Sequence, residues 1–400
     1  MKALSFSGSA SEYFKIWIVN IVLTIITLGV YYPWAKVRNK RYFYANTSLE
    51  DRNFEYHATG RQLLVGYLIA MVFLILYIVL QKISPVASLG VIVVFLLALP
   101  WIILRSMVFN MKMTSFSNVH FEFIGSVGSS YITYLATPIV MYISMGLIYG
   151  FIAYLSSLEF AYSSFINSIF LLSAFAFTLY AFAFIKKVST TFILNNTKYG
   201  NSQFEVDVNT KNFMLISLKT TAIAIFLFMM SFILVGTFGY LIFGLEYFAN
   251  LLSSIQYPGA LNSEESSANN EGLAASIIQI VGLIYIVILF ASIFIMAYKI
   301  SKERSYIFEN TILDEKVKFA STLEALPFGW LLFSNLILII ITLGFATPWA
   351  KVRAARYIMT NTLIEAKDGL DVFITQKTEE ESSLGEQIGD AFDVDVGIGI

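Results

Sequence analysis

Eight apolar segments, each of the length that crosses a bilayer as a helix, constrain this chain more than any other feature of its sequence. A helix of about 20 apolar residues spans the roughly 30 Å hydrocarbon core of a membrane. Only 13% of the residues are charged, about half the share usual in soluble domains. The sequence therefore predicts an all-α polytopic membrane protein with about eight transmembrane helices. We place them at residues 16–34, 63–80, 86–104, 131–153, 164–185, 220–243, 274–297 and 326–349.

The loops between these segments alternate in charge. Loops after the first, third, fifth and seventh segments are rich in Lys and Arg, whereas Lys82 is the one cation in the loops after the second, fourth and sixth. Short loops rich in Lys and Arg stay on the cytoplasmic side of a membrane, so we expect the basic loops to be cytoplasmic. The net charge of −1 gives no indication of a nucleic-acid partner.

A repeated motif organises the chain. IITLGVYYPWAKVR at 25–38 and IITLGFATPWAKVR at 340–353 share eleven of fourteen residues. Weaker copies preserve a Phe-Glu pair at 54–55, 121–122 and 204–205, and a gapped copy lies near 306–319. Internal duplication explains these coincidences. We therefore expect a transmembrane domain at 1–365 made of repeated units, with the best copies at 16–61 and 331–365.

Each unit has the same physical order. An apolar helix ends in a basic turn, a short segment ends in Asn-Thr, and an alternating stretch such as FEYHAT or QFEVDV follows a polar turn. Alternation with a period of two predicts a strand, so each basic loop is interpreted as a short cytoplasmic β-hairpin. Isolated hairpins are marginally stable in water, so we expect the four hairpins to pack together as a cap.

The number of crossings conflicts with the repeat. If the segment at 16–34 delivers its PWAKVR motif to the cytoplasm, the eighth segment must deliver its own copy to the other side, yet the residues after it are basic. One interpretation is full crossing, with the two copies inverted in the membrane. The other is that one or both segments enter and leave by the same face as broken helices.

The candidate functional residues lie in the two best copies. Asn20 and Asn335 occupy matching positions in apolar helices, where an amide needs a partner; they form either an interhelical contact or part of a polar pathway. The basic turns either anchor the topology or contact anionic headgroups, and Arg residues at i and i+3 share a helix face. The headgroup candidates are Lys36, Arg38, Arg41, Lys351, Arg353 and Arg356.

Chemistry at a catalytic or metal site is not indicated. The chain has no cysteine, and His57 and His120 lie in no metal-binding spacing. The centres of the apolar segments contain no Asp, Glu, Lys, Arg or His, which argues against a proton relay or an intramembrane protease. We predict no catalytic residue, no metal and no cofactor. Residues 366–400 are acidic and polar, a composition typical of a flexible tail.

The motifs together resemble a known family. TLGVYYPWAKVRNKRYFYANT with FEYHATG downstream, the second TLGFATPWAKVRAARY, and the ending GDAFDVDVGIGI are similar to the YjgN-like bacterial inner-membrane proteins. The resemblance covers nearly the whole chain. It implies a multi-pass protein of the Gram-negative inner membrane and supplies no catalytic residues.

Two functions fit these observations. A transporter or channel is favoured by duplicated architecture with matched polar residues in paired helices. A structural or lipid-interacting scaffold is favoured by basic turns without ionisable groups inside the helices. In both cases membrane lipids are the expected partners, and the sequence names no protein partner and no substrate. A water-accessible cavity lined by Asn20 and Asn335 would favour transport, and paired polar groups in a closed core would favour a scaffold.

Overall fold

The computed structural model describes residues 1–157, 163–243, 267–367, 369 and 372–379. Within these ranges, six helices have the length and composition to cross a membrane. Each leaves most of its apolar surface uncovered by protein, with 0% of residues buried in the core of Gly60–Ile83 and 17% in that of Phe165–Asn195. Apolar helix surfaces of this kind are stable in contact with lipid. The structure therefore agrees with the class that the sequence predicts, a helical polytopic membrane protein.

The basic loops do not form isolated hairpins but one continuous sheet. Within the described residues it has eleven strands in the order β1-β11-β10-β9-β8-β7-β6-β5-β4-β3-β2, and neighbours are antiparallel. Sheet neighbours satisfy the strand edges that single hairpins would leave open. The strands are β1 Lys2–Ala3, β2 Ser5–Phe6, β3 Thr47–Leu49, β4 Arg52–Tyr56, β5 Thr114–Phe116, β6 Val119–Phe123, β7 Thr197–Tyr199, β8 Ser202–Val206, β9 Thr311–Leu313, β10 Val317–Ser321 and β11 Thr362–Ala366.

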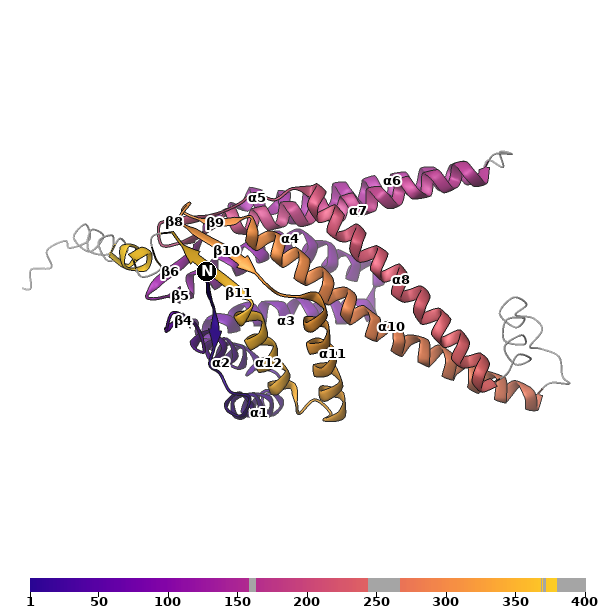
Figure 1. The fold of residues 1–400 in the computed structure, drawn as a ribbon, viewed down its shortest axis with the longest axis horizontal. Helices are drawn as coiled ribbons and strands as arrows, with labels where there is room; N and C mark the ends of the chain where they lie inside the picture. The colour runs from indigo at the N-terminus through magenta and orange to yellow at the C-terminus, as the bar shows by residue number, and fades with distance from the viewer. Residues whose placement is uncertain (158–162, 244–266, 368, 370–371, 380–400) are drawn as a thin grey trace, which may run out of the picture. The chain divides into compact units, whose positions relative to one another are not determined.

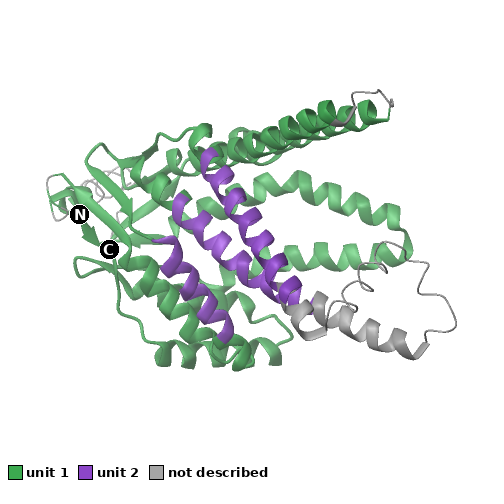
Figure 2. Ribbon diagram, turned by 45° about the vertical axis from the view of Figure 1, so that its right-hand side comes forward, with its two compact units in different colours: residues 1–214, 303–323, 338–400 green, residues 215–302, 324–337 purple. Residues whose placement is uncertain are grey.

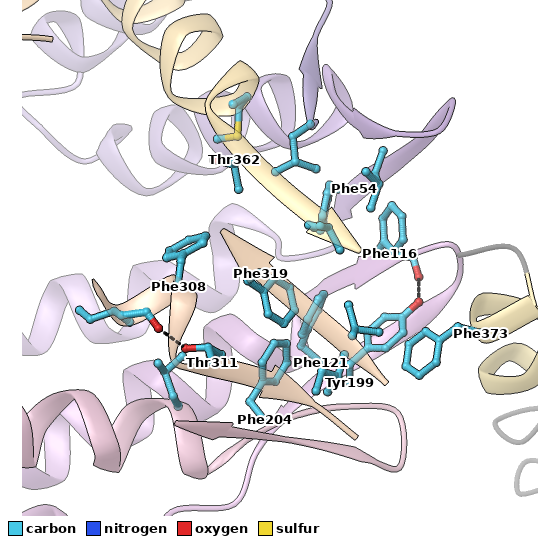
Figure 3. Close-up of a pocket in the computed structure, with 18 of the residues that line it drawn as sticks. Phe54, Phe116, Phe121, Tyr199, Phe204, Phe308, Thr311, Phe319, Thr362 and Phe373 are labelled. Carbon is cyan, nitrogen blue, oxygen red and sulfur yellow. Dashed lines mark hydrogen bonds between the residues drawn. The ribbon is translucent and has the colours of Figure 1, made fainter. Parts of the chain in front are cut away.

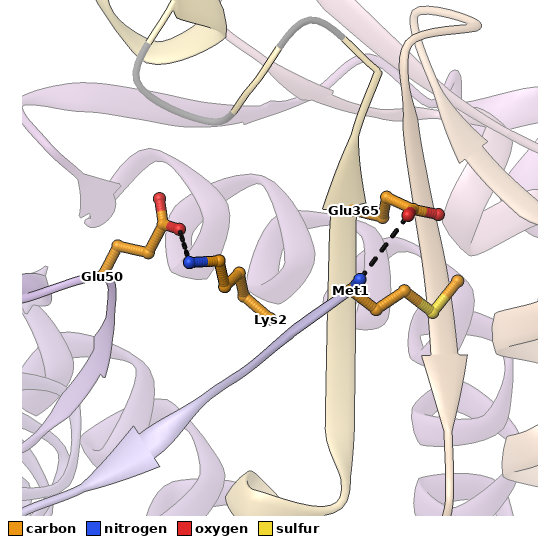
Figure 4. A network of polar contacts seen from close by, with 4 residues as sticks. All are labelled: Met1, Lys2, Glu50 and Glu365. Carbon is orange, nitrogen blue, oxygen red and sulfur yellow. Dashed lines mark hydrogen bonds and ion pairs between the residues drawn. The ribbon is translucent and has the colours of Figure 1, made fainter.

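The N-terminal segment closes this sheet into a barrel. β1 pairs with β11 and β2 pairs with β3, and Leu4 between them donates its N–H to the carbonyl of Thr362. The two outermost strands are therefore consecutive halves of one extended segment. Figure 4 shows the ion pairs on either side of it: the α-amino group of Met1 with Glu365 at 3.5 Å, and Lys2 with Glu50 at 3.1 Å. These exposed pairs contribute little energy, and the backbone pairing does the closing.

Along the chain, helical pairs connect successive strands of the barrel (labels in Figure 1). Each pair begins after one strand and returns to the next strand, which pairs with the first, so the whole chain is five copies of strand, helix pair, strand within the described ranges. The pairs are α1 Ala10–Ile26 with α2 Tyr32–Ala45; α3 Gly60–Ile83 with α4 Pro85–Lys112; α5 Val127–Tyr131, the π-turn Ile132–Ala136 and α6 Thr137–Ser156 with α7 Ser163–Asn195; α8 Thr210–Phe243 with α10 Ser267–Glu309; and α11 Ala325–Ile341 with α12 Thr347–Thr360.

The repeated threonine that begins the strand after each helix pair helps to end the preceding helix. Its hydroxyl donates to the carbonyl four residues earlier, which a helix end would otherwise leave unpaired. This bond recurs in all five described copies: Thr47 to Phe43 at 2.8 Å, Thr114 to Asn110 at 2.8 Å, Thr197 to Ile193 at 2.7 Å, Thr311 to Ile307 at 2.6 Å and Thr362 to Ile358 at 2.8 Å. The sequence signal Asn-Thr therefore marks where a helix stops and the barrel begins.

The first and last helix pairs enter and leave by the same face. β2, before α1, pairs with β3, after α2, and β10, before α11, pairs with β11, after α12. A single crossing between two paired strands is impossible, because both strands lie in the same sheet. Eight crossings are therefore not confirmed. The helices α1, α2, α11 and α12 are shorter than the six spanning helices of the described residues, and the strand pairing agrees with the second interpretation, in which the segments at 16–34 and 326–349 are broken helix pairs.

A left-handed turn breaks each re-entrant pair at the same place. Leu28 and Gly29 have φ values of +49° and +91°, and Leu343 and Gly344 have +49° and +93°. Left-handed backbone costs L-residues about 1–2 kcal/mol each, and glycine escapes this cost. Pro33 and Pro348 then stand near the start of the second helix, where a missing N–H breaks no helical hydrogen bond.

The chain divides into two compact units (Figure 2). The first comprises residues 1–214, 303–323 and 338–400 and contains the whole barrel. The second comprises residues 215–302 and 324–337. Inside the second unit, Phe294 packs edge-on against Trp330 with ring centres 5.3 Å apart, directly over Gly329.

Part of the predicted C-terminal tail is ordered against the barrel. Residues 372–379 are helical, and Phe373 and Ile374 are buried in the barrel core. Lys377 is buried as well and pairs with Asp314 at 3.3 Å. Residues 380–400 of the predicted tail lie outside the described residues.

Closure of the barrel fixes which fusion sites share a side of the membrane. We expect reporters placed after residue 367 and in the turn at 117–118 to report one side, and reporters after Ser84 and Ser157 to report the other. Paired phosphatase and fluorescent-protein fusions measure this directly. A reporter after residue 367 on the side of Ser84 would contradict the re-entrant interpretation.

The left-handed turns predict a position-specific cost. Gly344→Ala should destabilise the protein by about 1–2 kcal/mol, because its φ is +93° although a Cβ there meets no atom within 4 Å. Gly29→Ala should cost more, since its Cβ would also lie 3.1 Å from the hydroxyl of Tyr67. Thermal unfolding in detergent gives the comparison. Gly90→Ala, in open space within α4, is the control and should not destabilise.

Candidate functional site

Two layers of apolar side chains face one another inside the barrel. Register places Phe54 opposite Phe116, Phe121 opposite Tyr199, Phe204 opposite Leu313 and Phe319 opposite Ile364. Leu4 and Leu49 hold the corresponding positions in the first copy. Alternation sends these side chains inward and their neighbours, among them Glu55, Glu122 and Glu205, outward. In the Phe-Glu pair that the repeat preserves, the Phe therefore faces the barrel interior and the Glu faces outward.

An apolar cavity of about 360 Å³ lies between the two layers (Figure 3). Ligand cavities have volumes of about 300–1,000 Å³. One end reaches the last turns of α7, α10 and α12 through Leu194, Phe308 and Met359, and the other is lined by Phe373 and Ile374 of the C-terminal helix. The hydroxyl of Tyr199 is occupied by the carbonyl of Phe116 at 3.0 Å, so it offers the interior no free donor.

Arg304 is the one charged side chain among the described residues that line the cavity. Its guanidinium lies 4.2 Å from the centre of the Phe308 ring, and its Nη2 donates to Thr362 Oγ1 at 2.7 Å. Its Nε is buried and makes no hydrogen bond in the described part of the chain. A buried donor without an acceptor costs about 1–3 kcal/mol. The Nε–H of Arg304 is such a donor at the wall of the cavity.

A second hollow lies on the outside of the barrel, where α2 meets the start of α3. It has a volume of about 440 Å³ and is lined by Trp34, Val37, Arg38, Arg41, Thr59, Gly60 and Arg61. None of these described lining residues is acidic. A Cβ at Gly60 would collide with the Trp34 ring, so glycine lets the indole lie against the first turn of α3.

Neutral acceptors hold two of these arginines. Arg38 Nη1 donates to Asn20 Oδ1 and to the Tyr31 hydroxyl, both at 3.2 Å, and Arg41 Nη2 donates to the Ala58 carbonyl at 2.7 Å. The predicted Arg38–Arg41 pair therefore lies on one pocket. Because these three acceptors carry no charge, they do not neutralise the two guanidinium groups.

The buried amide of Asn20 is paired with polar groups of α2. It is 4% exposed, donates to Asn39 Oδ1 at 3.0 Å and accepts from Arg38. Asn20 thus forms a contact between α1 and α2, the two helices of the first pair. Asn335, 6% exposed, is also hydrogen-bonded or otherwise in contact.

The second copy uses its basic turn differently. Arg356 Nη2 donates to the Gly8 carbonyl at 3.0 Å, at the entry to α1, as Arg41 does at the entry to α3. Ser11 stands in α1 where Arg61 stands in α3, so this copy lacks the third arginine. Lys36, Lys351 and Arg353 are exposed, and Arg353 has a polar or electrostatic contact.

Lys40, in the same basic turn, has a packing role. Its Nζ donates to Asn110 Oδ1 at 2.5 Å and lies 4.7 Å from the centre of the Tyr56 ring. Burial, with a smaller contribution from Lys36, lowers the pKa of the Lys40 ammonium. This lysine therefore links the first repeat to the second through Asn110.

Sequence reasoning missed the barrel interior and Arg304. The repeated Phe positions were visible, but an alternating apolar face normally indicates a packed core. The order of the strands around a ring, which places these faces opposite one another, has no local signal. No cluster of three or more His, Cys, Asp or Glu side chains suited to a metal occurs in the described residues.

The architecture defines a class: a multi-pass membrane protein whose helical pairs begin and end in one closed, apolar β-barrel. A family model described as "Bacterial protein of unknown function (DUF898)" matches residues 1–391. This chain belongs to that family.

Named relatives cover nearly the same length. The chain is 25% identical over 393 residues to "Inner membrane protein YjgN" of Salmonella typhimurium, covering 95% of this chain and 93% of the relative. It is 28% identical over 371 residues to the protein of that name from Escherichia coli O157:H7, covering 90% and 87%. With the Escherichia coli K12 protein it shares 31% over 249 residues, covering 60% and 58%. No solved structure matches the chain.

The Asn20 network predicts a structural cost. Asn20→Ala should lower the free energy of unfolding by about 1–3 kcal/mol, because Arg38 and Asn39 would each lose a buried partner. Denaturant or thermal unfolding of the purified protein measures it. Ser144→Ala, whose hydroxyl only returns to its own helix at Val140, is the control. Equal stability of Asn20→Ala and the control would show that the amide is not a structural contact.

Proposed function

We propose that this chain is a non-enzymatic, lipid-interacting protein of the bacterial inner membrane. In this proposal the barrel lies at the cytoplasmic surface and the pocket of Arg38, Arg41 and Arg61 binds the headgroup of an anionic phospholipid. The names of the relatives support the location, and the basic loops support the side.

The observation that carries the proposal is the uncompensated charge of this pocket. Three guanidinium groups meet there without an acidic lining residue, beside the start of α3. Because α3 is long and apolar enough to cross the membrane, its first turn lies at the level of the headgroups. Arginine binds phosphate oxygens in a bidentate manner, and Trp34, stacked on Tyr31 with ring centres 6.1 Å apart, belongs to the amphipathic rings that prefer this level.

A transporter or channel is the second proposal. Two matched re-entrant pairs, each broken at a glycine, support it, because discontinuous helices are common in transporters. Flux assays with the chain in vesicles test this directly. Solute passage that disappears in the double variant Asn20→Ala, Asn335→Ala, with both proteins folded, would favour transport over a scaffold.

The headgroup pocket is tested with phospholipid. We expect the full chain to retain phosphatidylglycerol over phosphatidylcholine in native mass spectrometry after delipidation. Arg38→Gln with Arg61→Gln should reduce that preference by at least about tenfold, since loss of even one charged hydrogen bond costs about 1.5–3 kcal/mol.

Arg353→Gln is the matched control, because it removes the residue equivalent to Arg38 from the copy that lacks a third arginine. It should keep most of the preference. Retention of phosphatidylglycerol by the double variant at the level of the unchanged chain would exclude the pocket as a headgroup site.

A further inference from the structure

The barrel interior has the shape and chemistry of a binding site rather than of a packed core. Protein interiors leave few voids larger than a water molecule, yet the cavity here measures about 360 Å³. Its wall is made of Phe, Leu, Ile, Val and Met side chains together with Tyr199, Thr311, Thr362 and Arg304. Both threonine hydroxyls are already spent on helix carbonyls. A water cluster would find too few partners, so the bulk of the occupant must be apolar.

The one exception sits at the end of the cavity that adjoins the helices. Arg304 lies on the last turns of α10, held between the Phe308 ring and the Thr362 hydroxyl, and both of these residues also line the cavity. Its buried Nε has no acceptor in the described residues. A cation with an unused donor at an apolar wall is complementary to an anionic oxygen joined to an aliphatic chain.

The opposite end of the cavity is apolar. Phe373 and Ile374 from the C-terminal helix lie there, with Phe373 stacked on Tyr199 at 6.4 Å between ring centres. Figure 3 shows Phe308 and Thr362 at one side of the hollow and Phe373 at another, with the phenylalanines of the barrel between them. The cavity thus has one charged end, at Arg304, and one apolar end, at Phe373 and Ile374.

We propose that the barrel binds a single long-chain fatty acid, with its carboxylate on Arg304 and its chain between the two apolar layers. The methyl end of the fatty acid contacts Phe373 and Ile374. This site is distinct from the headgroup pocket of Arg38, Arg41 and Arg61, and its occupant is one acyl chain rather than a phospholipid headgroup.

Binding is measured with the full chain in phosphatidylcholine nanodiscs, with empty nanodiscs as background. Saturated fatty acids from octanoate to palmitate should bind saturably, one per chain. Affinity should rise by about fourfold per methylene until the cavity is filled and then level off, whereas partition into lipid continues to rise. Dodecanol, which has the chain without the carboxylate, should bind at least about tenfold more weakly than dodecanoate.

Two variants separate the charged end from the apolar wall. Arg304→Gln should weaken dodecanoate binding by about tenfold and leave dodecanol unchanged. Leu313→Phe, which enlarges a buried side chain of the wall, should weaken both. Lys302→Gln, an exposed cation of the same helix, is the control and should bind as the unchanged chain does.

The outcomes are decisive. Saturable binding that follows this pattern supports the site. Binding without saturation, equal binding of dodecanol and dodecanoate, or normal binding by folded Leu313→Phe would overturn it. If Arg304→Gln fails to fold, Arg304→Lys and Leu313→Phe still test the two ends. The phospholipid assay with Arg38→Gln and Arg61→Gln tests a different site, so a negative result there would not affect the conclusion about fatty-acid binding.

Discussion

Backbone pairing around a closed ring is the constraint on which the rest of the structure depends. Because β2 pairs with β3 and β10 pairs with β11, every helical segment must return to the sheet from which it left. That requirement joins the helices in pairs, including the shorter first and last pairs, and returns both ends of each pair to the same sheet. The threonine hydroxyl at each return ends the helix where the ring begins.

The closed barrel also determines where the apolar and the charged side chains lie. Inward positions meet across the barrel as an apolar hollow, and outward positions carry the acidic and basic side chains. At the junction with the helices, the copies have diverged: the first presents Arg38, Arg41 and Arg61 on one pocket, whereas the last has Ser11 in place of the third arginine. Arg304 in turn occupies the place in the fourth copy that Lys40 has in the first, seven residues before the strand threonine. A repeated framework thus supports different polar sites in different copies.

Local patterns predicted much of this fold. Helix ends at Asn-Thr, the alternating strands and the matching Asn20 and Asn335 positions are all local or duplicated features. The sequence left the crossings at 16–34 and 326–349 open, because hydropathy measures apolar length and is insensitive to a left-handed turn at Leu28 and Gly29. The ring itself depends on pairing between residues 2–3 and 363–364, a separation that no local pattern encodes. The cavity and Arg304 depend on that ring, and so they escaped prediction too.

The N-terminal segment that closes the barrel also determines when the barrel can be completed during synthesis. Residues 2–6 are synthesised before every other strand of the barrel, yet half of their partners belong to β11, the last strand along the chain. Chains are made from the N-terminus at about 5–20 residues per second. The helical pairs therefore enter the bilayer one after another around an unfinished barrel, and the early strand waits, with one edge unpaired, until synthesis passes residue 364. That edge therefore needs protection during translation, although it is paired with β11 in the folded protein.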